Sequence, residues 1–376
     1  MQVVPLKGRG SLSNRVSRFQ AYTRHAVSDD WAWPRGTLED AATPADVHNV
    51  VQAVVTDPPT VRPVTTVSLE TARSIISRNT SPDIPFDQSI NTYRGCEHGC
   101  IYCYARPSHA YLDLSPGLDF ETRLYAKQNA AQVLRTELSR PGYEPKLIAM
   151  GTNTDPYQPI EKRLRLTASL LEVFDEYNHP VSLTTKSALI TRDIPILARL
   201  ARRNLVRVLI SIGTLDRELA RRMEPRAATP AARLDTIREL KQAGIPVGVI
   251  IAPVVPGLTD HDLERVAIAA QQAGATDASY VVLRLPREVS GLFREWLQAH
   301  YPMKAAHVMN LVRAMRNGKD YDPDYRQRMA GGGVYADMLR QRFHRICTRT
   351  GLNRRRRELD SSAFQVPGRA SQLALF

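Results

Sequence analysis

Short apolar runs alternate with longer amphipathic stretches through the middle of the chain. Between the apolar runs, hydrophobic residues recur at helical spacing and predict helices over 120–138, 166–177, 194–202, 231–243 and 263–273. The apolar runs themselves predict six strands, at 88–93, 146–150, 181–185, 206–212, 247–252 and 280–285. Strands that alternate with helices are typical of parallel βαβ units, so the pattern predicts an α/β fold.

The two ends of the chain lack this alternation. The first part is polar and interrupted by prolines, which predicts an irregular extension with one short helix near residues 44–55. Beyond the last strand the pattern turns helical, at 291–300 and 304–317. We therefore predict four parts: a basic irregular extension (1–85), a central α/β barrel (86–290), a helical region (291–352) and a flexible basic tail (353–376).

Length and hydropathy limit the class of protein. A chain of 376 residues with 43% hydrophobic residues can form one large α/β barrel with extensions. Apolar runs are all well short of the roughly 18 residues that a membrane span needs. The amino terminus does not read as a signal sequence, so we predict a cytoplasmic protein without a membrane partner.

Positive charge gathers at both ends of the chain, which has a net charge of +13. Residues 338–357 hold eight arginines and no acid; Arg342, Arg345 and Arg349 recur at helical spacing, and a cluster follows at 354–357. Such a basic helix and cluster would neutralise several phosphates, which predicts nucleic acid as a partner. A solvated helix face with a basic tail is the alternative. The first 28 residues also lack acids and contain Lys7, Arg9, Arg15, Arg18 and Arg24.

Three of the four cysteines lie in one short stretch, Cys96-Glu-His-Gly-Cys100-Ile-Tyr-Cys103. Three thiolates at this spacing suit three irons of a four-iron, four-sulfur cluster and leave the fourth iron without a protein ligand. Structural zinc is the competing interpretation, because His98 or His109 would complete a tetrahedron. However, no second cysteine pair is present and the fourth cysteine is remote. The spacing therefore favours an iron–sulfur site.

This stretch resembles the cluster loop of radical SAM enzymes, in which three cysteines bind the cluster and S-adenosylmethionine (SAM) chelates the fourth iron. The resemblance implies a partial (β/α)6 barrel and a flavodoxin- or ferredoxin-type reductant. It also implies reductive cleavage of SAM to methionine and a 5′-deoxyadenosyl radical. Tyr102, the aromatic residue before the last cysteine, would lie near the adenine.

Ligands of parallel α/β folds gather at the carboxyl ends of the strands, and this chain has polar residues there. An aspartate before a proline also serves as a turn and helix cap, and a lysine that ends a strand is often only solvated. By the same resemblance, the SAM-binding residues would be Thr152, Asn153, Thr154 and Asp155 for the amino group, Lys186 for the carboxylate, Ser211 and Thr214 for ribose or carboxylate, and Arg233.

Within the superfamily, the chain is similar to the spore photoproduct lyase group, often described as DNA repair photolyase-like. An amino-terminal stretch, Gly8-Arg-Gly-Ser-Leu-Ser-Asn14, resembles a hallmark of one uncharacterised bacterial branch. The lyase resemblance covers roughly residues 88–285 and is carried by Cys100-Ile-Tyr-Cys-Tyr104, Thr154-Asp155-Pro-Tyr-Gln and Thr185-Lys186.

One departure separates this chain from the lyases, which return hydrogen through a cysteine and a pair of tyrosines. Tyr102 and Tyr104 match the tyrosines and are candidate catalytic residues, but Thr152 stands at the best match to the cysteine. A threonine O–H is a poor donor to a carbon radical, so the lyase reaction itself is not implied. Cys347 would substitute only if the carboxyl-terminal region covered the barrel mouth; a small core residue is the alternative.

The chain ends in Gln372-Leu-Ala-Leu-Phe376, which resembles the short peptide by which bacterial replication and repair proteins bind the sliding clamp. Leu373, Leu375 and Phe376 would be apolar anchors, and Gln372 would hydrogen-bond. The alternative is an end that docks on its own domain.

Together these observations predict a radical SAM enzyme that acts on DNA or in its repair. A radical SAM enzyme that modifies RNA, protein or a small metabolite is one alternative. A non-catalytic iron–sulfur sensor that binds nucleic acid is another.

Overall fold

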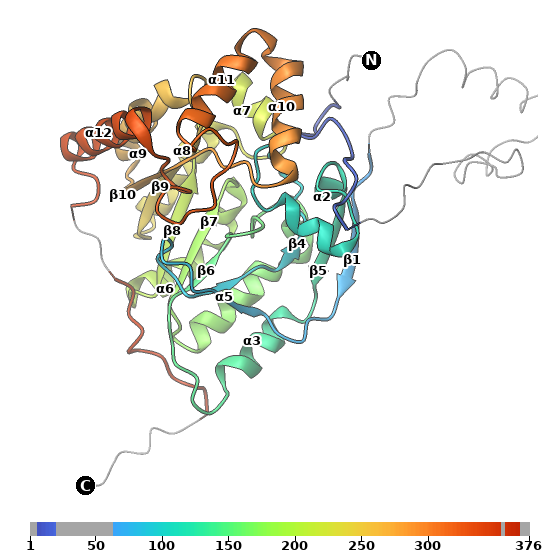
Figure 1. Cartoon of the computed structure of the whole chain (residues 1–376). Coiled ribbons are helices and arrows are strands. Elements are labelled where there is room, and N and C mark those ends of the chain that lie inside the picture. Colours follow the sequence, from blue (N-terminus) through green and yellow to red (C-terminus); the bar gives the residue numbers. More distant parts are fainter. Residues whose placement is uncertain (1–5, 20–62, 355–357, 369–376) are drawn as a thin grey trace, which may run out of the picture.

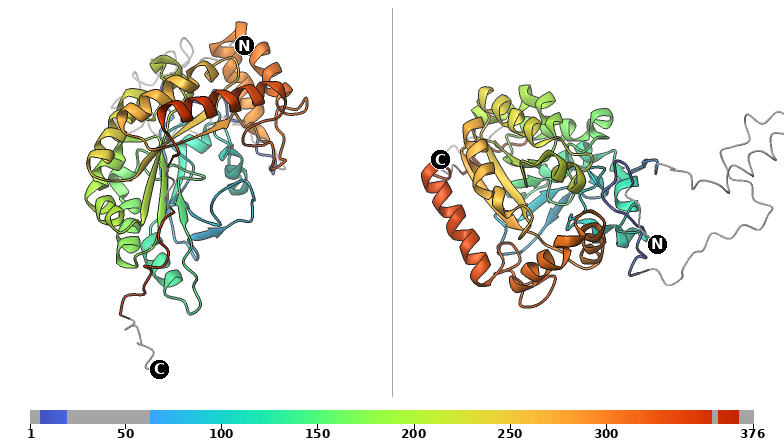
Figure 2. Two further views of the ribbon diagram at one scale, coloured as in Figure 1. Left: turned by 90° about the vertical axis from the view of Figure 1, so that its left-hand side faces the viewer. Right: turned by 90° about the horizontal axis from the view of Figure 1, so that it is seen from above.

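The structure, a computed structural model, describes residues 6–19, 63–354 and 358–368. Its main body is a curved seven-stranded sheet in the order β10-β9-β8-β7-β6-β3-β2, parallel except for β2 with β3. Helices cover its outer face, as in a partial barrel (Figures 1 and 2). The strands are β2 (Ile76–Arg78), β3 (Gln88–Ile90), β6 (Ile148–Met150), β7 (Val181–Thr185), β8 (Val206–Ser211), β9 (Val247–Val254) and β10 (Asp277–Val282).

The predicted α/β fold is confirmed, and its cause lies in the composition of the strands. β8 and β9 are rich in valine, isoleucine and leucine because both faces of a parallel sheet are covered, whereas β7 (Val-Ser-Leu-Thr-Thr) also buries small hydroxyl residues. The helices that follow present one apolar face each to the sheet. These helices are α3 (Ala130–Leu138), α4 (Glu161–Leu164), α5 (Leu166–Glu176), α6 (Ile194–Arg202), α7 (Arg217–Met223), α8 (Pro230–Gln242) and α9 (Leu263–Ala273), with short 3₁₀ turns at η1 (Arg106–Leu112), η2 (Ala188–Asp193) and η3 (Asp260–Asp262).

The core forms where these two apolar surfaces meet. Leu170 and Phe174 of α5 and Leu200 of α6 are fully buried against the strands. Each buried side chain of this size contributes roughly 1.5–3 kcal/mol relative to exposure. The core therefore holds the strands firmly, and the loops at their carboxyl ends are built on a rigid base.

The single helix predicted over 120–138 is wrong in its first half. The chain there forms a short helix, α2 (Asp119–Thr122), and a strand, β5 (Arg123–Lys127), before α3 begins. β5 pairs with β1 (Thr66–Glu70) and β4 (Tyr93–Arg94) in a separate three-stranded sheet. Leu124 and Ala126 are buried while their neighbours are not, so the segment follows the two-residue period of a strand. β1 and β2 also lie within the extension that was predicted to be irregular.

Three helices follow the barrel, at α10 (Glu288–His300), α11 (Pro302–Ala314) and α12 (Gly333–Thr350). α10 contains the predicted segment 291–300, and α11 covers the predicted segment 304–317 as far as Ala314. α10 and α11 share a cluster around the buried Trp296, and α12 packs on α9 (Figure 2). None of the helices in the described part of the chain is both long and apolar enough to cross a membrane.

The chain after α12 returns along the barrel end at which the strands begin. The Asp360 N–H donates to the carbonyl of Asn204 at 3.0 Å, just before β8, and the Gln365 N–H donates to the carbonyl of Tyr177 at 3.1 Å. Residues 358–368 of the predicted flexible tail are therefore packed on the barrel. The remaining predictions for the ends of the chain, on residues 44–55, Arg24, 355–357 and Gln372 to Phe376, lie outside the described residues.

Candidate functional site

The cysteine loop follows β3 and β4 at the carboxyl end of the sheet, where the strand order predicts ligands. The Cys96 N–H donates to the carbonyl of Phe120 at 2.9 Å, and the Cys103 N–H donates to the carbonyl of Cys100 at 3.2 Å. Gly95 precedes the first cysteine with φ of +76°, and a Cβ there would come within 2.9 Å of the Phe120 carbonyl oxygen. The loop conformation therefore depends on this glycine.

The three cysteines fit an iron–sulfur cluster in their chemistry. All are free thiols, with Cys96 and Cys100 buried and Cys103 partly buried. Burial, reinforced by Glu224, raises the pKa of Cys100 to about 12, and burial also raises the pKa of Cys96 well above its ordinary value. Thiolates in this loop therefore need positive charge, which cluster irons would supply.

Zinc, the competing metal, has less support from this geometry. His109, one of the two candidate ligands, has its Nε2 2.9 Å from the carbonyl of Arg123, and burial lowers the pKa of this histidine to about 4. His98 instead lies against Asp155, with 3.3 Å between Nδ1 and Oδ2.

A buried ion pair supports the loop from beneath. The guanidinium of Arg106 is fully buried and donates to the carbonyls of Cys100 at 2.9 Å, Gly99 at 3.2 Å and Gly117 at 2.8 Å. Its Nη2 pairs with Glu121 Oε1 at 2.5 Å. Removing one member of such a pair leaves a buried charge without a partner, at a cost of about 3–5 kcal/mol. Neither residue was predicted as part of the site.

Glu121 also fixes the start of the chain, which we call the N-terminal strap (residues 6–19). Its two carboxylate oxygens accept the N–H groups of Gly10 at 3.0 Å and Ser11 at 2.8 Å. A Cβ on Gly10 would come within 1.8 Å of the Gly99 carbonyl oxygen, so the strap touches the cysteine loop. The sequence motif beginning at Gly8 resembled a hallmark of one bacterial branch, but it did not predict that this segment contacts Glu121 and the cysteine loop.

The other face of the strap contacts α10 (Figure 1), which also shares a hydrophobic cluster with Ile101 of the cysteine loop. Ser13 Oγ donates to Glu295 Oε2 at 2.7 Å, and Arg18 pairs with Glu288 at 2.9 Å. Asn14 and Asp119 exchange two hydrogen bonds, of 2.9 and 3.0 Å. The strap therefore joins the barrel to the helical region beside the cysteines.

Asp155, which follows β6, connects the cysteine loop to the end of β7. Its Oδ1 accepts the Thr185 hydroxyl at 2.7 Å, and its Oδ2 accepts the Lys186 N–H at 2.8 Å and lies near His98. Burial alone would raise the pKa of Asp155, but His98 and these hydrogen bonds outweigh it and lower the pKa to about 2. Gln158 adds a second connection, because its side chain bonds the Glu97 N–H at 2.9 Å and the Gly95 carbonyl at 3.3 Å.

Residues 152–154 are held by an asparagine that the sequence did not single out. Asn91 Oδ1 accepts the N–H groups of Asn153 at 3.0 Å and Thr154 at 3.2 Å, while the Thr154 hydroxyl donates to the carbonyl of Tyr93 at 3.2 Å. Among the described residues, the side chains of Thr152 and Asn153 have no hydrogen-bond partner. These two side chains are therefore free to bind a ligand, whereas the Thr154 hydroxyl already has a partner.

A chain of buried polar groups links Tyr102 to the end of β8. The Tyr102 hydroxyl donates to Glu224, Glu224 pairs with Arg233, and Arg233 Nη1 donates to the Ser211 carbonyl at 2.8 Å. Burial would raise the pKa of Glu224, but Arg233, Lys186 and Tyr102 outweigh it and lower that pKa. The Lys186 ammonium lies 6.0 Å from the Tyr102 ring centre.

Tyr102, Lys186 and Arg233 thus lie around Glu224. In the sequence, Glu224 belongs to a stretch (Glu224-Pro-Arg226) that resembles one common in the superfamily, but no role was predicted for it. Glu224 and Arg233 border a cavity of about 10 Å³, enough for roughly one water molecule. Ser211 and Thr214 lie at this strand end, but their hydroxyls donate to the Ala252 carbonyl at 3.3 Å and to Asp262 at 2.5 Å.

Cys347 and Tyr104 have separate surroundings. Cys347 is buried in α12 and lies 3.7 Å from the Asn353 amide, which bonds the backbone of Ala278 near the start of β10. That is the end of the barrel opposite the cysteine loop, so Cys347 is a core residue. Tyr104 is 44% exposed, and its hydroxyl donates to the carbonyl of Thr152.

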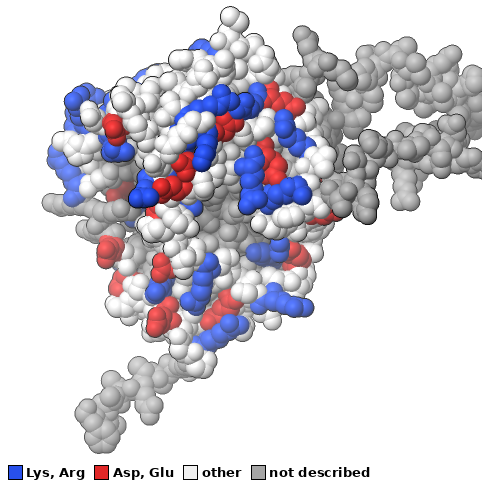
Figure 3. All heavy atoms as spheres, in the orientation of Figure 1, with Lys and Arg blue, Asp and Glu red and all other residues white. Residues whose placement is uncertain are grey.

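Surface charge is mixed over most of the face in Figure 3, with basic residues gathered at the edge over α12. Arg342 pairs with Glu264 at 2.6 Å and Arg340 pairs with Asp337 at 2.6 Å. Arg345 and Arg349 are exposed and form no ion pair with any residue that the structure describes. The predicted basic helix therefore exists, with part of its charge neutralised within the fold.

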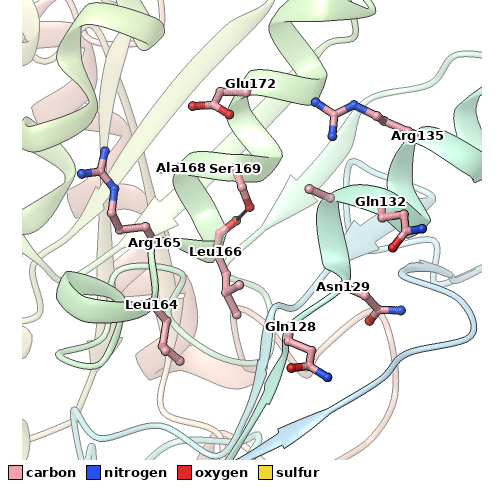
Figure 4. Close-up of a pocket in the computed structure, with 11 residues that line it drawn as sticks. Gln128, Asn129, Gln132, Arg135, Leu164, Arg165, Leu166, Ala168, Ser169 and Glu172 are labelled. Carbon is pink, nitrogen blue, oxygen red and sulfur yellow. Dashed lines mark hydrogen bonds between the residues drawn. The ribbon is translucent and has the colours of Figure 1, made fainter.

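A surface pocket lies apart from these residues. It has a volume of about 540 Å³ and lies between α3 and the start of α5 (Figure 4). Its lining includes Gln132, Arg135, Arg165 and Glu172 but no cysteine and no predicted site residue.

Comparisons with known proteins agree with this arrangement. A model described as the radical SAM superfamily matches residues 90–269, from the end of β3 into α9. An uncharacterised protein of Mycobacterium tuberculosis is 39% identical over 246 residues, which cover 65% of this chain and 72% of the relative. An uncharacterised protein of Methanocaldococcus jannaschii is 26% identical over 221 residues, which cover 59% and 79%.

Among solved structures, spore photoproduct lyase complexed with dinucleoside spore photoproduct is similar in fold. The TM-score is 0.52 with 15% sequence identity, over 76% of this chain and 79% of the lyase. At this identity the similarity bears on the fold alone.

Proposed function

Because the chain belongs to the radical SAM superfamily, whose enzymes contain a [4Fe–4S] cluster and use SAM, we propose that Cys96, Cys100 and Cys103 are its cluster ligands. Such a cluster, when bound and reduced, supplies the electron for reductive cleavage of SAM. The observation that carries the proposal is that the three-cysteine loop lies at the carboxyl ends of the strands, where the buried Cys100 thiol interacts electrostatically with Lys186 and with the Tyr102–Glu224–Arg233 chain.

We assign the SAM-binding roles according to which polar side chains still lack a partner in the described structure. Lys186 forms no ion pair with the described carboxylates, so its ammonium suits the methionyl carboxylate. Thr152 and Asn153 suit the amino group, while Asp155 and Thr154 position the loop that carries them. Tyr102 would contact the adenine, held in place by Glu224 and, through it, by Arg233. Ser211 and Thr214 border the ribose region, where they would have to exchange present hydrogen bonds for a ligand.

DNA, or a step in its repair, is the substrate class that we propose. The net charge of +13 and the exposed Arg345 and Arg349 of α12 support a polyanionic partner. A solved spore photoproduct lyase structure holds a dinucleoside spore photoproduct, and the shared fold makes a similar substrate worth testing. RNA, protein or a small metabolite is the alternative. A flavodoxin- or ferredoxin-type reductant and a sliding clamp bound through Gln372, Leu373, Leu375 and Phe376 are the proposed protein partners.

The first experiment tests the radical chemistry. The full chain is reconstituted anaerobically with iron and sulfide, then given dithionite and SAM, and 5′-deoxyadenosine and methionine are measured. We expect both products from the native protein and from Cys347→Ala, whose cysteine lies in the core. Cys96→Ala should give neither. Absence of both products from a native protein that holds its cluster would refute the proposal.

The second experiment addresses the substrate. Deuterium-labelled candidates are supplied in turn as damaged DNA, RNA and cell-extract metabolites, and deuterium in 5′-deoxyadenosine is measured by mass spectrometry. Transfer from DNA alone is the expected result. Transfer only from RNA or from a metabolite would replace the DNA proposal with that alternative.

A further inference from the structure

A second group of charged and aromatic residues lies beside the cysteine loop, at the carboxyl end of β10. We call it the mouth cluster (Tyr104, Arg284, Tyr321, Tyr325 and Arg328). The guanidinium carbon of Arg284 lies 4.7 Å from the ring centre of Tyr104, the residue directly after Cys103. A group bound by Arg284 would therefore lie next to the cysteine loop.

Arg284 is weakly satisfied by the protein itself. Its Nη2 lies 3.5 Å from the Tyr321 hydroxyl, at the long limit of a hydrogen bond, and its Nη1 lies 3.5 Å from the sulfur of Met329, which is only a weak acceptor. Its Nε is buried and has no hydrogen-bond partner in the part of the chain that the structure describes. Since a guanidinium carries five donors, most of its binding capacity is unused.

The electrostatic surroundings of Arg284 also favour an anion. No described carboxylate forms an ion pair with it, and the neighbouring Arg328 is already paired with Asp83 at 2.5 Å. A second buried guanidinium, Arg316, lies close enough that burial and then Arg284 lower its pKa to about 10. Asp83 and Asp322 also act on these two arginines, but Asp83 is paired with Arg328 and neither carboxylate forms an ion pair with Arg284. A bound anion would therefore be stabilised by Arg284, whose planar guanidinium has matching geometry.

The mouth cluster is held in place by the segment that joins α11 to α12. The Val282 N–H donates to the Met329 carbonyl at 2.9 Å, and the Gly332 N–H donates to the Met315 carbonyl at 3.0 Å. Arg328 donates two hydrogen bonds of 2.5 Å to Asp83, which lies between β2 and β3. Because β10 and β2 are the two edge strands of the sheet, this ion pair spans the opening of the partial barrel.

Two exposed tyrosine rings complete the cluster. Tyr104 is 44% exposed and Tyr325 is 49% exposed, and the Tyr325 ring lies 4.6 Å from the guanidinium carbon of Arg328. Aromatic rings beside arginines are the surfaces on which single-stranded nucleic acids stack their bases. The group therefore combines an unpaired cation for a phosphate with rings for a base.

We propose that Arg284 binds a phosphate of the substrate at the barrel mouth, with Tyr104 and Tyr325 as stacking surfaces for the attached nucleotide. This inference rests on the proposed function, because it gives the substrate an orientation relative to the cysteine loop. The phosphate would come from a polynucleotide or from a free nucleotide, and the two sources share the same recognition chemistry.

The test measures binding rather than turnover. The full chain, reconstituted with cluster and SAM but without reductant, is titrated into fluorescein-labelled single-stranded oligothymidylate, and fluorescence anisotropy gives the Kd. Arg284→Gln should weaken binding by about tenfold, the effect of losing a hydrogen bond to a charged group. The matched control is Arg326→Gln, on the same segment, whose side chain is 88% exposed and pairs only with Asp324. This control should change the Kd less than twofold.

Two results would overturn the inference: an unchanged Kd for Arg284→Gln, or an equal loss in Arg326→Gln, which would indicate diffuse charge. Should Arg284→Gln not fold, Arg284→Lys keeps the charge but loses the planar fork, and it should still weaken binding. Competition by thymidine monophosphate at millimolar concentration would support a free nucleotide as the source. Competition only by unlabelled oligothymidylate would support a polynucleotide.

These outcomes are independent of the radical proposal. Arg284-dependent binding without formation of 5′-deoxyadenosine by the native protein would refute the proposed chemistry and leave the phosphate site. Formation of 5′-deoxyadenosine with binding that does not depend on Arg284 would refute the phosphate site alone.

Discussion

The two sides of the cysteine loop differ in how completely their polar groups are paired. On the side of the N-terminal strap, Arg106 and Glu121 are fully buried, and between them they bind backbone groups of the loop, the strap and the turn before α2. On the side of the mouth cluster, Arg284 has only long contacts and two tyrosine rings are exposed. A buried, fully bonded network rigidifies the fold, whereas unused donors beside open space suit a ligand.

The largest expected loss of stability would come from removing the buried ion pair on the strap side. Glu121→Ala leaves the buried Arg106 without a counter-ion and frees the Gly10 and Ser11 N–H groups. We expect the free energy of unfolding to fall by about 3–5 kcal/mol, measured by urea denaturation. Glu295→Ala is the control, because it removes only the carboxylate that accepts the Ser13 hydroxyl. Equal losses in the two variants would contradict the central role of the buried pair.

Gly10→Ala tests the contact between strap and loop without changing charge. The added Cβ would lie 1.8 Å from the Gly99 carbonyl oxygen, so the strap must move away. Overpacking of this kind costs about 1–3 kcal/mol, and we expect faster proteolysis of the strap as well as lower stability. Gly8→Ala is the comparison: nothing lies within 4 Å of its Cβ, and it bears only the cost of φ at +78°. The strap would not be tightly docked if Gly8→Ala were the more damaging change.

The ion pair between Arg328 and Asp83, beside the mouth cluster, should make the stability depend on pH in the acid range. The hydrogen bond from Arg328 lowers the pKa of Asp83 below its ordinary value. Its contribution to stability is therefore full above the ordinary aspartate pKa of about 3.9 and is lost as pH falls through the lower folded pKa. Asp83→Asn should reduce the free energy of unfolding by about 1–2 kcal/mol at neutral pH, and the difference from the native protein should shrink in acid. A difference independent of pH would contradict the ion pair.

The smallest effect on stability is expected from the exposed rings. Tyr325→Ala should leave the melting temperature nearly unchanged, because the ring is 49% exposed. Affinity for oligothymidylate should nevertheless fall by about 1 kcal/mol, roughly fivefold, as expected for loss of one stacking surface. Tyr111→Ala, at another ring that is 71% exposed, is the control for affinity and should leave the Kd unchanged; its stability is not compared, because the ring contacts Phe19 and Arg18 of the strap. Equal losses of affinity in Tyr325→Ala and Tyr111→Ala would contradict a specific stacking role for Tyr325.

Local patterns predicted the frame of the fold well. β8 and β9 are rich in branched apolar residues because both faces of the sheet are covered, and this enrichment is visible in the sequence. The segment 120–138 failed because a five-residue strand, β5, stands between helix-forming stretches, and its partner β1 lies in a region without an apolar pattern.

The candidate site could be predicted only where chemistry lies in one short stretch, as in the cysteine loop. Glu121 meets Gly10 across 111 positions, and no local pattern announces such a contact. Ser211 and Thr214 illustrate the opposite difficulty, because their residue types suit a ligand while Ala252 and Asp262 already accept their hydroxyl protons. Arg284 did carry a signal, a charged residue within the last predicted strand, although the sequence did not show that it lacks an acidic partner.

The strap also has a consequence for the order in which the molecule is made. Its residues leave the ribosome long before α10 does, yet Ser13 bonds Glu295, which is translated 282 residues later. Domains fold largely as their chain emerges, so the barrel strands have formed before α10 is available to the strap. The contact between the strap and α10, beside the cysteine loop, therefore forms late in synthesis, when the strap, which was made much earlier, docks on α10.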